Sequence, residues 1–313
     1  MAQMTKEEFW KNFNIGREVQ LSGNFIYDGL LVFEQMEHFY NEDEIFEFFY
    51  FISVGIERLL KANVVLIEHS FDSVQSELEN SLRTHNHTEL KNRIEEKHNL
   101  HLGKVHNEFL QILTKFYKTT RYDRFSIYNY QHYDKEKDVL ISFLKKYLAR
   151  EIHTNFLNPT ANDIKIKKFI GRVIGKIISS LYDILHEESH RLNIYSYEIR
   201  TFSKAYKIFL EKDFTFEREK ILQKEILVYL LQNTEDSGFK EHIKKHLPPL
   251  EFLNGSENTY TKCLLDLSKC SEFLDELEAR YDDLEDKKQR FAAIAVIGND
   301  NLIFRKDMAD EEE

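Results

Sequence analysis

Residues 45–68 read IFEFFYFISVGIERLLKANVVLIE, and this stretch indicates the structural class of the whole chain. Its apolar residues recur with the helical period and would occupy most of the circumference of a helix. Asn41 and three acidic residues come directly before the stretch, an order that is typical of a helix start. We therefore expect a long helix here, at the centre of a bundle.

The composition of the 313-residue chain also favours helices. It contains only 10 Gly and 3 Pro, whereas average proteins contain roughly 7% and 5% of these residues. Few turn-forming residues remain for the tight turns that β-rich folds need. The 25 Phe and 16 Tyr recur in helix-period segments, so we expect them in the core. The predicted fold class is all-α.

Polar and turn-forming segments divide the sequence into regions. Residues 128–137 are polar and show no helical stripe, so we expect a first domain over residues 1–135 and a second helical region over residues 136–290. That second region contains a long helix over residues 164–192 and another that begins near residue 258. Two β-type runs within residues 291–306 predict a short C-terminal β-hairpin. The acidic residues 307–313 are expected to form a disordered tail.

Charge and hydropathy restrict the partners and the location of the protein. The formal net charge of −11 argues against non-specific binding of duplex DNA, because binding to a polyanion requires many cations. No apolar run reaches the roughly 18–20 residues that cross a bilayer. The opening, MAQMTKEEFW, lacks the basic and then apolar layout of a secretory signal. We expect a cytoplasmic protein without a membrane partner.

The two cysteines, Cys263 and Cys270, lie seven residues apart on the helix that is expected to begin near residue 258. On one continuous helix this spacing separates their Cα atoms by about 10 Å, which is too far for a disulfide. We therefore expect reduced thiols.

A local basic segment stands out against the acidic background. Lys165, Lys167, Lys168 and Arg172 lie close together without an acidic residue among them. The segment is either the solvated face of a helix or a contact for RNA, which binds through its phosphates.

Three segments within residues 45–126 resemble the HEPN superfamily, a group of small helical-bundle domains found in prokaryotic toxins, phage-defence systems and CRISPR effectors. Residues 48–61, FFYFISVGIERLLK, are similar to the long first core helix of these domains, in which an acid beside Leu-Leu-Lys recurs. Residues 83–90, RTHNHTEL, resemble the start of the next helix. Residues 109–117 and 121–126, FLQILTKFY and RYDRFS, lie where those domains carry their active-site helix. The resemblance implies an N-terminal HEPN-like bundle.

The ribonuclease signature of this superfamily is an arginine that is followed, after four to six residues, by a histidine. In the family mechanism two domains face each other across a dimer, where paired Arg and His side chains polarise the scissile phosphate and transfer protons. The signature is degenerate here, because the fifth residue after Arg121 is Ser126. The resemblance nevertheless implies that Arg121, Arg124 and Ser126 occupy the site. The alternative for both arginines is a cation at a helix end.

A literal match to the same signature, Arg93 to His98, occurs one helix earlier. Positions five apart on a helix differ by about 140° in direction, so these two side chains need not converge. A solvated helix face is the alternative interpretation.

Histidines suggest two metal sites. His186, Glu187 and His190 form an H-E-x-x-H pattern, which places two imidazoles on one helix face to hold Zn²⁺ while the glutamate acts as a general base. The alternative is a solvated or interface helix. His85 and His87 could form a ligand cluster with His69, or they could lie exposed in a loop that caps a helix.

The resemblance to the HEPN superfamily implies a component of a prokaryotic defence or toxin system. The chain would be an RNA-directed HEPN-like effector, a metal-independent endoribonuclease without a cofactor, or a non-catalytic relative of one. We expect a homo-oligomer or a protein complex, with RNA as a further partner. The alternative is a helical scaffold that assembles a complex, and the third hypothesis is a zinc hydrolase built on His186 and His190.

Overall fold

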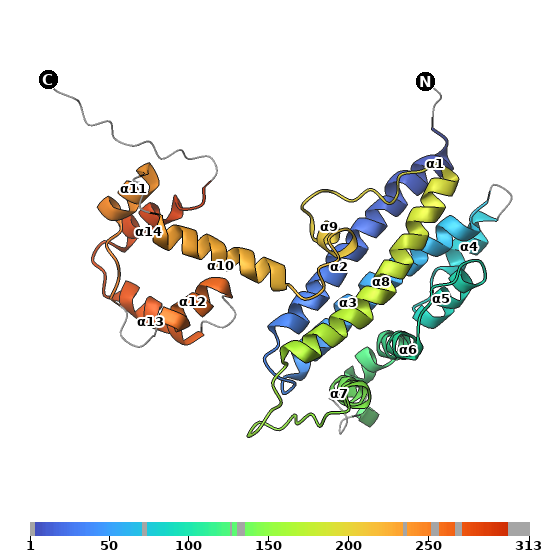
Figure 1. The fold of residues 1–313 in the computed structure, drawn as a ribbon, viewed down its shortest axis with the longest axis horizontal. Helices are drawn as coiled ribbons and strands as arrows, with labels where there is room; N and C mark the ends of the chain where they lie inside the picture. The colour runs from blue at the N-terminus through green and yellow to red at the C-terminus, as the bar shows by residue number, and fades with distance from the viewer. Residues whose placement is uncertain are drawn as a thin grey trace. The chain divides into compact units, whose positions relative to one another are not determined.

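The structure, a computed structural model, describes residues 4–70, 74–125, 127–129, 135–233, 237–251, 257–266 and 271–299 (Figure 1). Helices account for its regular structure throughout these ranges, and the β-type pairing found there is an isolated bridge between His38 and Ala161. The all-α class is therefore confirmed. Among the described residues, no helix combines the length and the apolar character that crossing a bilayer requires.

The chain divides into two compact units, residues 1–218 and residues 219–313. The boundary that the sequence predicts at residues 135/136 falls inside the first unit instead. Helices on both sides of that position pack against the same central helix and share one core, so the polar segment is a connection within a domain.

The first unit consists of long and short helices around a single core. In chain order they are α1 (Lys6–Phe9), a π-helical segment η1 (Trp10–Ile15), α2 (Gly16–Gln35), α3 (Glu42–Glu68), α4 (Gln75–Ser81), α5 (His87–Glu95), α6 (Lys104–Lys118), the 3₁₀ segments η2 (Thr120–Phe125) and η3 (Ile127–Asn129), α7 (Lys135–Leu148), α8 (Ile164–Leu192) and α9 (Lys204–Phe209).

Helix α3 occupies the centre of this unit, as its sequence predicts. Helices α2, α5, α6, α7 and α8 all pack against it, and α2, α3 and α8 run alongside one another in Figure 1. Buried residues occur on every side of α3, because a helix that is apolar all round must be covered all round. Asn41 is the N-cap residue, although its side-chain amide contacts Glu44 rather than the helix backbone.

Helices α2 and α3 approach each other closely at Gly55. A Cβ atom at this position would lie 2.6 Å from Cγ1 of Ile26 and 3.0 Å from the carbonyl oxygen of Ser22. The Ser22 hydroxyl donates a hydrogen bond of 2.7 Å to the Gly55 carbonyl across the same contact. Only glycine allows the two backbones to pack at this distance.

Asn162 and Asp163, directly before α8, link the start of that helix to the end of α2 by hydrogen bonds. Asp163 caps α8 by accepting two backbone N–H groups of its first turn, at 3.0 and 3.1 Å. The buried side-chain amide of Asn162 donates to the carbonyl oxygens of Phe33 and Met36, at 2.8 and 3.3 Å. Carbonyl groups at the C-terminal end of α2, which lack partners within the helix, thus obtain them from a distant part of the sequence.

The second unit contains shorter helices. They are α10 (Glu217–Gln232), which begins in the first unit, α11 (Gly238–His246), α12 (Glu257–Leu265), α13 (Ser271–Asp282) and α14 (Lys287–Ala295). The single long helix that the sequence predicts from residue 258 is therefore wrong.

Two further expectations for the second unit need correction. Residues 291–295, expected as the first strand of a hairpin, belong to α14, because a short apolar run that contains Ala292, Ala293 and Ala295 favours a helix. Residues 300–313, with the rest of the hairpin and the acidic tail, lie outside the described residues. Cys263 is not a free thiol; α12 ends at Leu265, so the distance argument for one continuous helix fails, and Cys270 lies outside the described residues.

Candidate functional site

The three segments that resemble the HEPN superfamily meet around one aromatic ring. Glu57 and Lys61 come from α3, His85 from the loop before α5, Tyr117 from the last turn of α6, and Arg121 from η2. We call these five residues the Tyr117 cluster. Residues far apart in the sequence are brought together here because α5 and α6 both pack on α3.

Glu57 orients two of the basic groups in the Tyr117 cluster. Its carboxylate is only 9% exposed and lies 2.7 Å from Nζ of Lys61 and 3.0 Å from Nδ1 of His85. A carboxylate only accepts hydrogen bonds, so Nδ1 of His85 carries the hydrogen. The His85 side chain is 48% exposed, which leaves Nε2 accessible from solvent. A carboxylate that fixes an imidazole in this way is a typical arrangement for a general base.

Tyr117 forms the platform of the cluster. The ring of His85 lies against it with centroids 4.8 Å apart, and Cζ of Arg121 lies 3.7 Å from its centroid. Burial raises the pKa of the Tyr117 hydroxyl, and this effect outweighs the opposing charge of Arg121. Tyr117 therefore stays protonated at neutral pH, and its ring provides the surface against which His85 and Arg121 pack.

Arg121 packs between aromatic rings rather than acting only as a cation at a helix end. Its guanidinium also lies 4.5 Å from the ring centroid of Tyr122. Its Nε is buried without a hydrogen-bond partner in the described structure. Of the other candidates in this segment, Arg124 belongs to η2 but its side chain lies outside the described part of the chain, as does the whole of Ser126.

His87 lies deeper than the sequence suggests. Its side chain is fully buried, and Nε2 donates to the carbonyl oxygen of Ser53 on α3, at 2.9 Å. Burial lowers the pKa of His87 below its ordinary value, so the imidazole is neutral. The expectation that His87 is exposed is wrong, although Asn86 does cap α5. In the described ranges, His69, His85 and His87 form no cluster that could hold a metal ion.

The literal signature, Arg93 to His98, does not converge. Arg93 forms a two-pronged ion pair with Glu68, at 2.8 and 2.6 Å, which raises the pKa of its guanidinium. Nε2 of His98 lies 2.9 Å from the buried carboxylate of Glu188 on α8. Arg93 thus pairs with α3, whereas His98, in the loop after α5, pairs with α8, so the two side chains have separate partners.

The basic segment of α8 is only partly available. Lys167 contacts the backbone carbonyl and the carboxylate of Glu34, at 2.5 and 3.2 Å, and Lys168 pairs with Glu217 at 2.8 Å. Lys165 and Arg172 are exposed. The Lys168 side chain is itself 49% exposed, so of these four basic residues Lys167 is the one held away from solvent.

His186 and His190 lie on one face of α8, as their spacing predicts. Their Nε2 atoms are 3.3 Å apart, and both rings lie against Tyr197. Glu187 is directed elsewhere, with Oε2 4.0 Å from Nδ1 of His98. No described group of three His, Cys, Asp or Glu side chains could hold a metal ion, so the third ligand that a zinc hydrolase needs is missing from this part of the chain.

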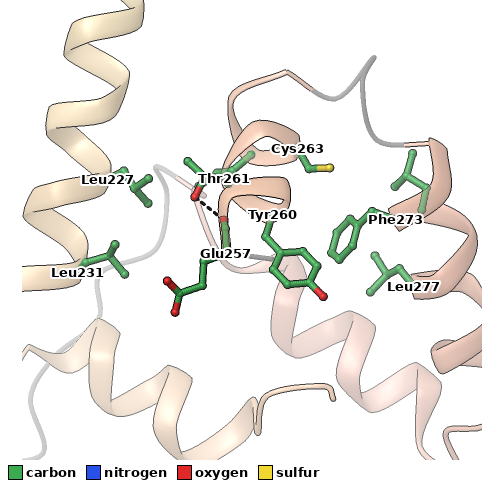
Figure 2. Close-up of a pocket in the computed structure, with 10 residues that line it drawn as sticks. Leu227, Leu231, Glu257, Tyr260, Thr261, Cys263, Phe273 and Leu277 are labelled. Carbon is green, nitrogen blue, oxygen red and sulfur yellow. Dashed lines mark hydrogen bonds between the residues drawn. The ribbon is translucent and has the colours of Figure 1, made fainter. Parts of the chain in front are cut away.

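The second unit contains an apolar cavity of about 630 Å³ (Figure 2). Leu227 and Leu231 of α10 lie on one side, and Tyr260 packs edge-on against Phe273, with ring centroids 5.1 Å apart. Glu257 is the one ionisable carboxylate among the lining residues. A cavity of this composition can bind apolar groups, but it provides no pair of groups for acid–base chemistry.

Comparisons of the chain with models of protein families, with curated proteins and with solved structures find no match.

Proposed function

We propose that the first unit binds RNA at the Tyr117 cluster and cleaves it without a metal ion, as a cytoplasmic effector of a prokaryotic defence or toxin system. The observation that supports this proposal is the position of His85 and Arg121 against one ring, with Glu57 fixing the imidazole. The resemblance to the HEPN superfamily suggests the same chemistry, with His85 in place of the histidine that the degenerate signature lacks.

Each group has a role that follows from its chemistry. Arg121 is always charged and binds a phosphate oxygen, while Nε2 of His85 accepts the proton of the ribose 2′-hydroxyl. The 2′-oxygen then attacks phosphorus, the bond to the 5′-oxygen breaks, and the leaving oxygen takes a proton from water. The products are a 2′,3′-cyclic phosphate and a 5′-hydroxyl. The Tyr117 and Tyr122 rings, which hold the guanidinium, leave it oriented for this contact.

The test is cleavage of total RNA in the presence of a chelator. We expect His85→Gln to reduce the rate by about 10²- to 10⁴-fold, as for the loss of a general base. Arg121→Ala should reduce both cleavage and RNA binding. His153→Gln, at an exposed histidine outside the cluster, is the matched control and should keep full activity. Intact RNA at high concentrations of the wild-type protein, with no RNA binding, would contradict the proposal.

A second candidate function, assembly of a complex, is favoured by helix α10. Seven of its large apolar side chains are between 45% and 76% exposed. They are Ile221, Leu222, Ile226, Val228, Tyr229, Leu230 and Leu231. These side chains lie on several faces of α10, and Leu231 also lines the apolar cavity, so part of the set forms a surface directed away from the cavity.

We assign one stripe of these side chains to a second copy of the chain. Leu222, Ile226 and Tyr229 follow one another at helical spacing and form a stripe on α10 away from Leu227 and Leu231, which line the cavity. Two such stripes can cover each other about a two-fold axis, the commonest symmetry of homo-oligomers.

Measurement of the mass in solution tests this assignment. Ile226→Asp should convert a dimer into a monomer, whereas Phe202→Asp, at an apolar residue of the first unit that is 88% exposed, should leave the dimer intact. A wild-type monomer at high concentration would rule out the second copy.

A further inference from the structure

We propose that His186 and His190 form a binding site for a divalent metal ion that prefers nitrogen ligands, with Zn²⁺ as the best fit. The site is separate from the Tyr117 cluster and needs no catalytic role. Both histidines are exposed on the last turns of α8, so an ion can reach them from solvent.

The distance between the two imidazoles carries the argument. Zn²⁺ binds histidine nitrogen at about 2.0–2.1 Å, so two ligands at the tetrahedral angle hold their nitrogens about 3.3–3.4 Å apart. The two Nε2 atoms are separated by 3.3 Å. At this separation the two nitrogens can share an ion or form a long N–H···N hydrogen bond, and the metal titration distinguishes these two cases.

The two rings are held in place by their surroundings. The ring of Tyr197 lies against both imidazoles, with centroid distances of 4.6 and 4.9 Å. The backbone of Tyr197 is itself fixed, because the buried Tyr182 hydroxyl donates to its carbonyl oxygen at 2.7 Å. Tyr182 in turn stacks on Phe209, with centroids 4.7 Å apart. Less side-chain freedom is therefore lost when an ion binds.

The set of ligands selects the kind of ion. Imidazole nitrogens suit Zn²⁺, Cu²⁺ and Ni²⁺, whereas Mg²⁺ and Ca²⁺ prefer oxygen. Two protein ligands leave two tetrahedral positions for water, so the ion is exchangeable. Glu187 faces His98, which leaves no general base beside the ion and separates this site from that of a hydrolase.

A second histidine pair in the chain provides a matched control. His242 and His246 have the same spacing on α11, and their ring centroids are 4.9 Å apart. Nε2 of His242, however, lies 3.4 Å from the carbonyl oxygen of Ala293, so it is directed toward that oxygen. The two pairs have the same spacing but different ring orientations. A metal ion that binds only the pair on α8 therefore requires the ring orientation, and not merely two histidines four residues apart.

The experiment is calorimetric titration of the metal-free, full-length protein with Zn²⁺, together with the visible absorption of bound Co²⁺ as a measure of tetrahedral geometry. One ion should bind per chain. His186→Ala and His190→Ala should each weaken binding by at least about tenfold and abolish the Co²⁺ signal, as expected when one of two ligands is lost.

His242→Ala should leave both measurements unchanged, and circular dichroism should show that all variants keep their helices. The proposal is overturned if no ion binds at millimolar Zn²⁺, or if either substitution in α8 leaves the affinity unaltered. In that case the contact between the two imidazoles is a hydrogen bond only.

Discussion

Helices α3 and α10 share one feature of their sequences but have different surroundings. Both carry apolar residues around most of their circumference. In the first unit five helices cover α3, whereas α10 has no fully buried residue within the described structure. An apolar pattern therefore specifies how much of a helix surface must be buried, but not whether the residues that bury it belong to the same chain.

The largest loss of stability should come from removing a buried side chain of α3. Phe48 is completely buried, and its ring lies 4.8 Å from that of Phe33. Phe48→Ala leaves a cavity and should lower the free energy of unfolding by about 3–5 kcal/mol. Urea unfolding measures this loss, and a change below about 1 kcal/mol would show that the site is not packed as described.

A smaller effect is expected where α3 crosses α2. Gly55→Ala gains helix propensity of about 1 kcal/mol, but it also places a Cβ atom against Ile26 and a backbone oxygen, which costs about 1–3 kcal/mol. We expect a net loss of about 1 kcal/mol in urea unfolding. Gly16→Ala is the control, because its Cβ would lie 3.6 Å from the nearest atom, and it should not destabilise the protein.

The contribution of the contact between α3 and α5 to the stability of the fold should decrease at acidic pH. Burial lowers the pKa of His87 in the folded state below the ordinary histidine value of about 6.5, so the unfolded chain binds this proton first as the pH falls. Stability from His87 is present above about pH 6.5 and is lost as the pH falls toward the lowered pKa.

His87→Gln keeps an N–H donor for Ser53 but removes the titration, so the unfolding midpoint should depend less on pH between about pH 7 and pH 5. His69 and His106 also have pKa values that burial lowers, and some dependence should remain. An unchanged pH dependence in the variant would contradict the assignment.

The smallest effect on stability is expected in α10. Tyr229→Ser removes a side chain that is 62% exposed, so the free energy of unfolding of the monomer should change by no more than about 0.5 kcal/mol. A loss of several kcal/mol in the free energy of unfolding at low protein concentration would mean that residues of the same chain bury this face of α10. Helices α3 and α10 would then not differ in this respect.

The fold class and the main helices of the first unit could be predicted because their apolar periodicity is strong. Helix α8 begins and ends as expected, since Asp163 caps its start and Asn193 adopts a left-handed conformation at its end. The domain boundary could not be predicted, because a polar connection such as residues 128–137 has the same composition inside a domain as between domains. The breaks at Leu265 and after Asp282 fall in sequence that has no proline or glycine to mark them.

The candidate site was predicted only in part. The sequence predicts Arg121 as a site residue through its position in a family-like segment, but it places His85 in an exposed loop that caps a helix. No local pattern connects the two, because each is linked to the other only through the ring of Tyr117, against which both pack. One usable signal was present: Glu57 and Lys61 are charged residues four apart on an otherwise apolar helix, and a buried charge needs a partner.

The hydrogen bonds of Asn162 have a consequence for protein synthesis. As the ribosome releases the chain from its N-terminus, the carbonyl oxygens of Phe33 and Met36 cannot obtain this partner until residue 162 has emerged. The face of α3 that α8 covers must also wait, because α8 extends to Leu192. A nascent chain that stops near residue 135 therefore exposes core surface, and this stage of translation is the point at which a chaperone would be most needed.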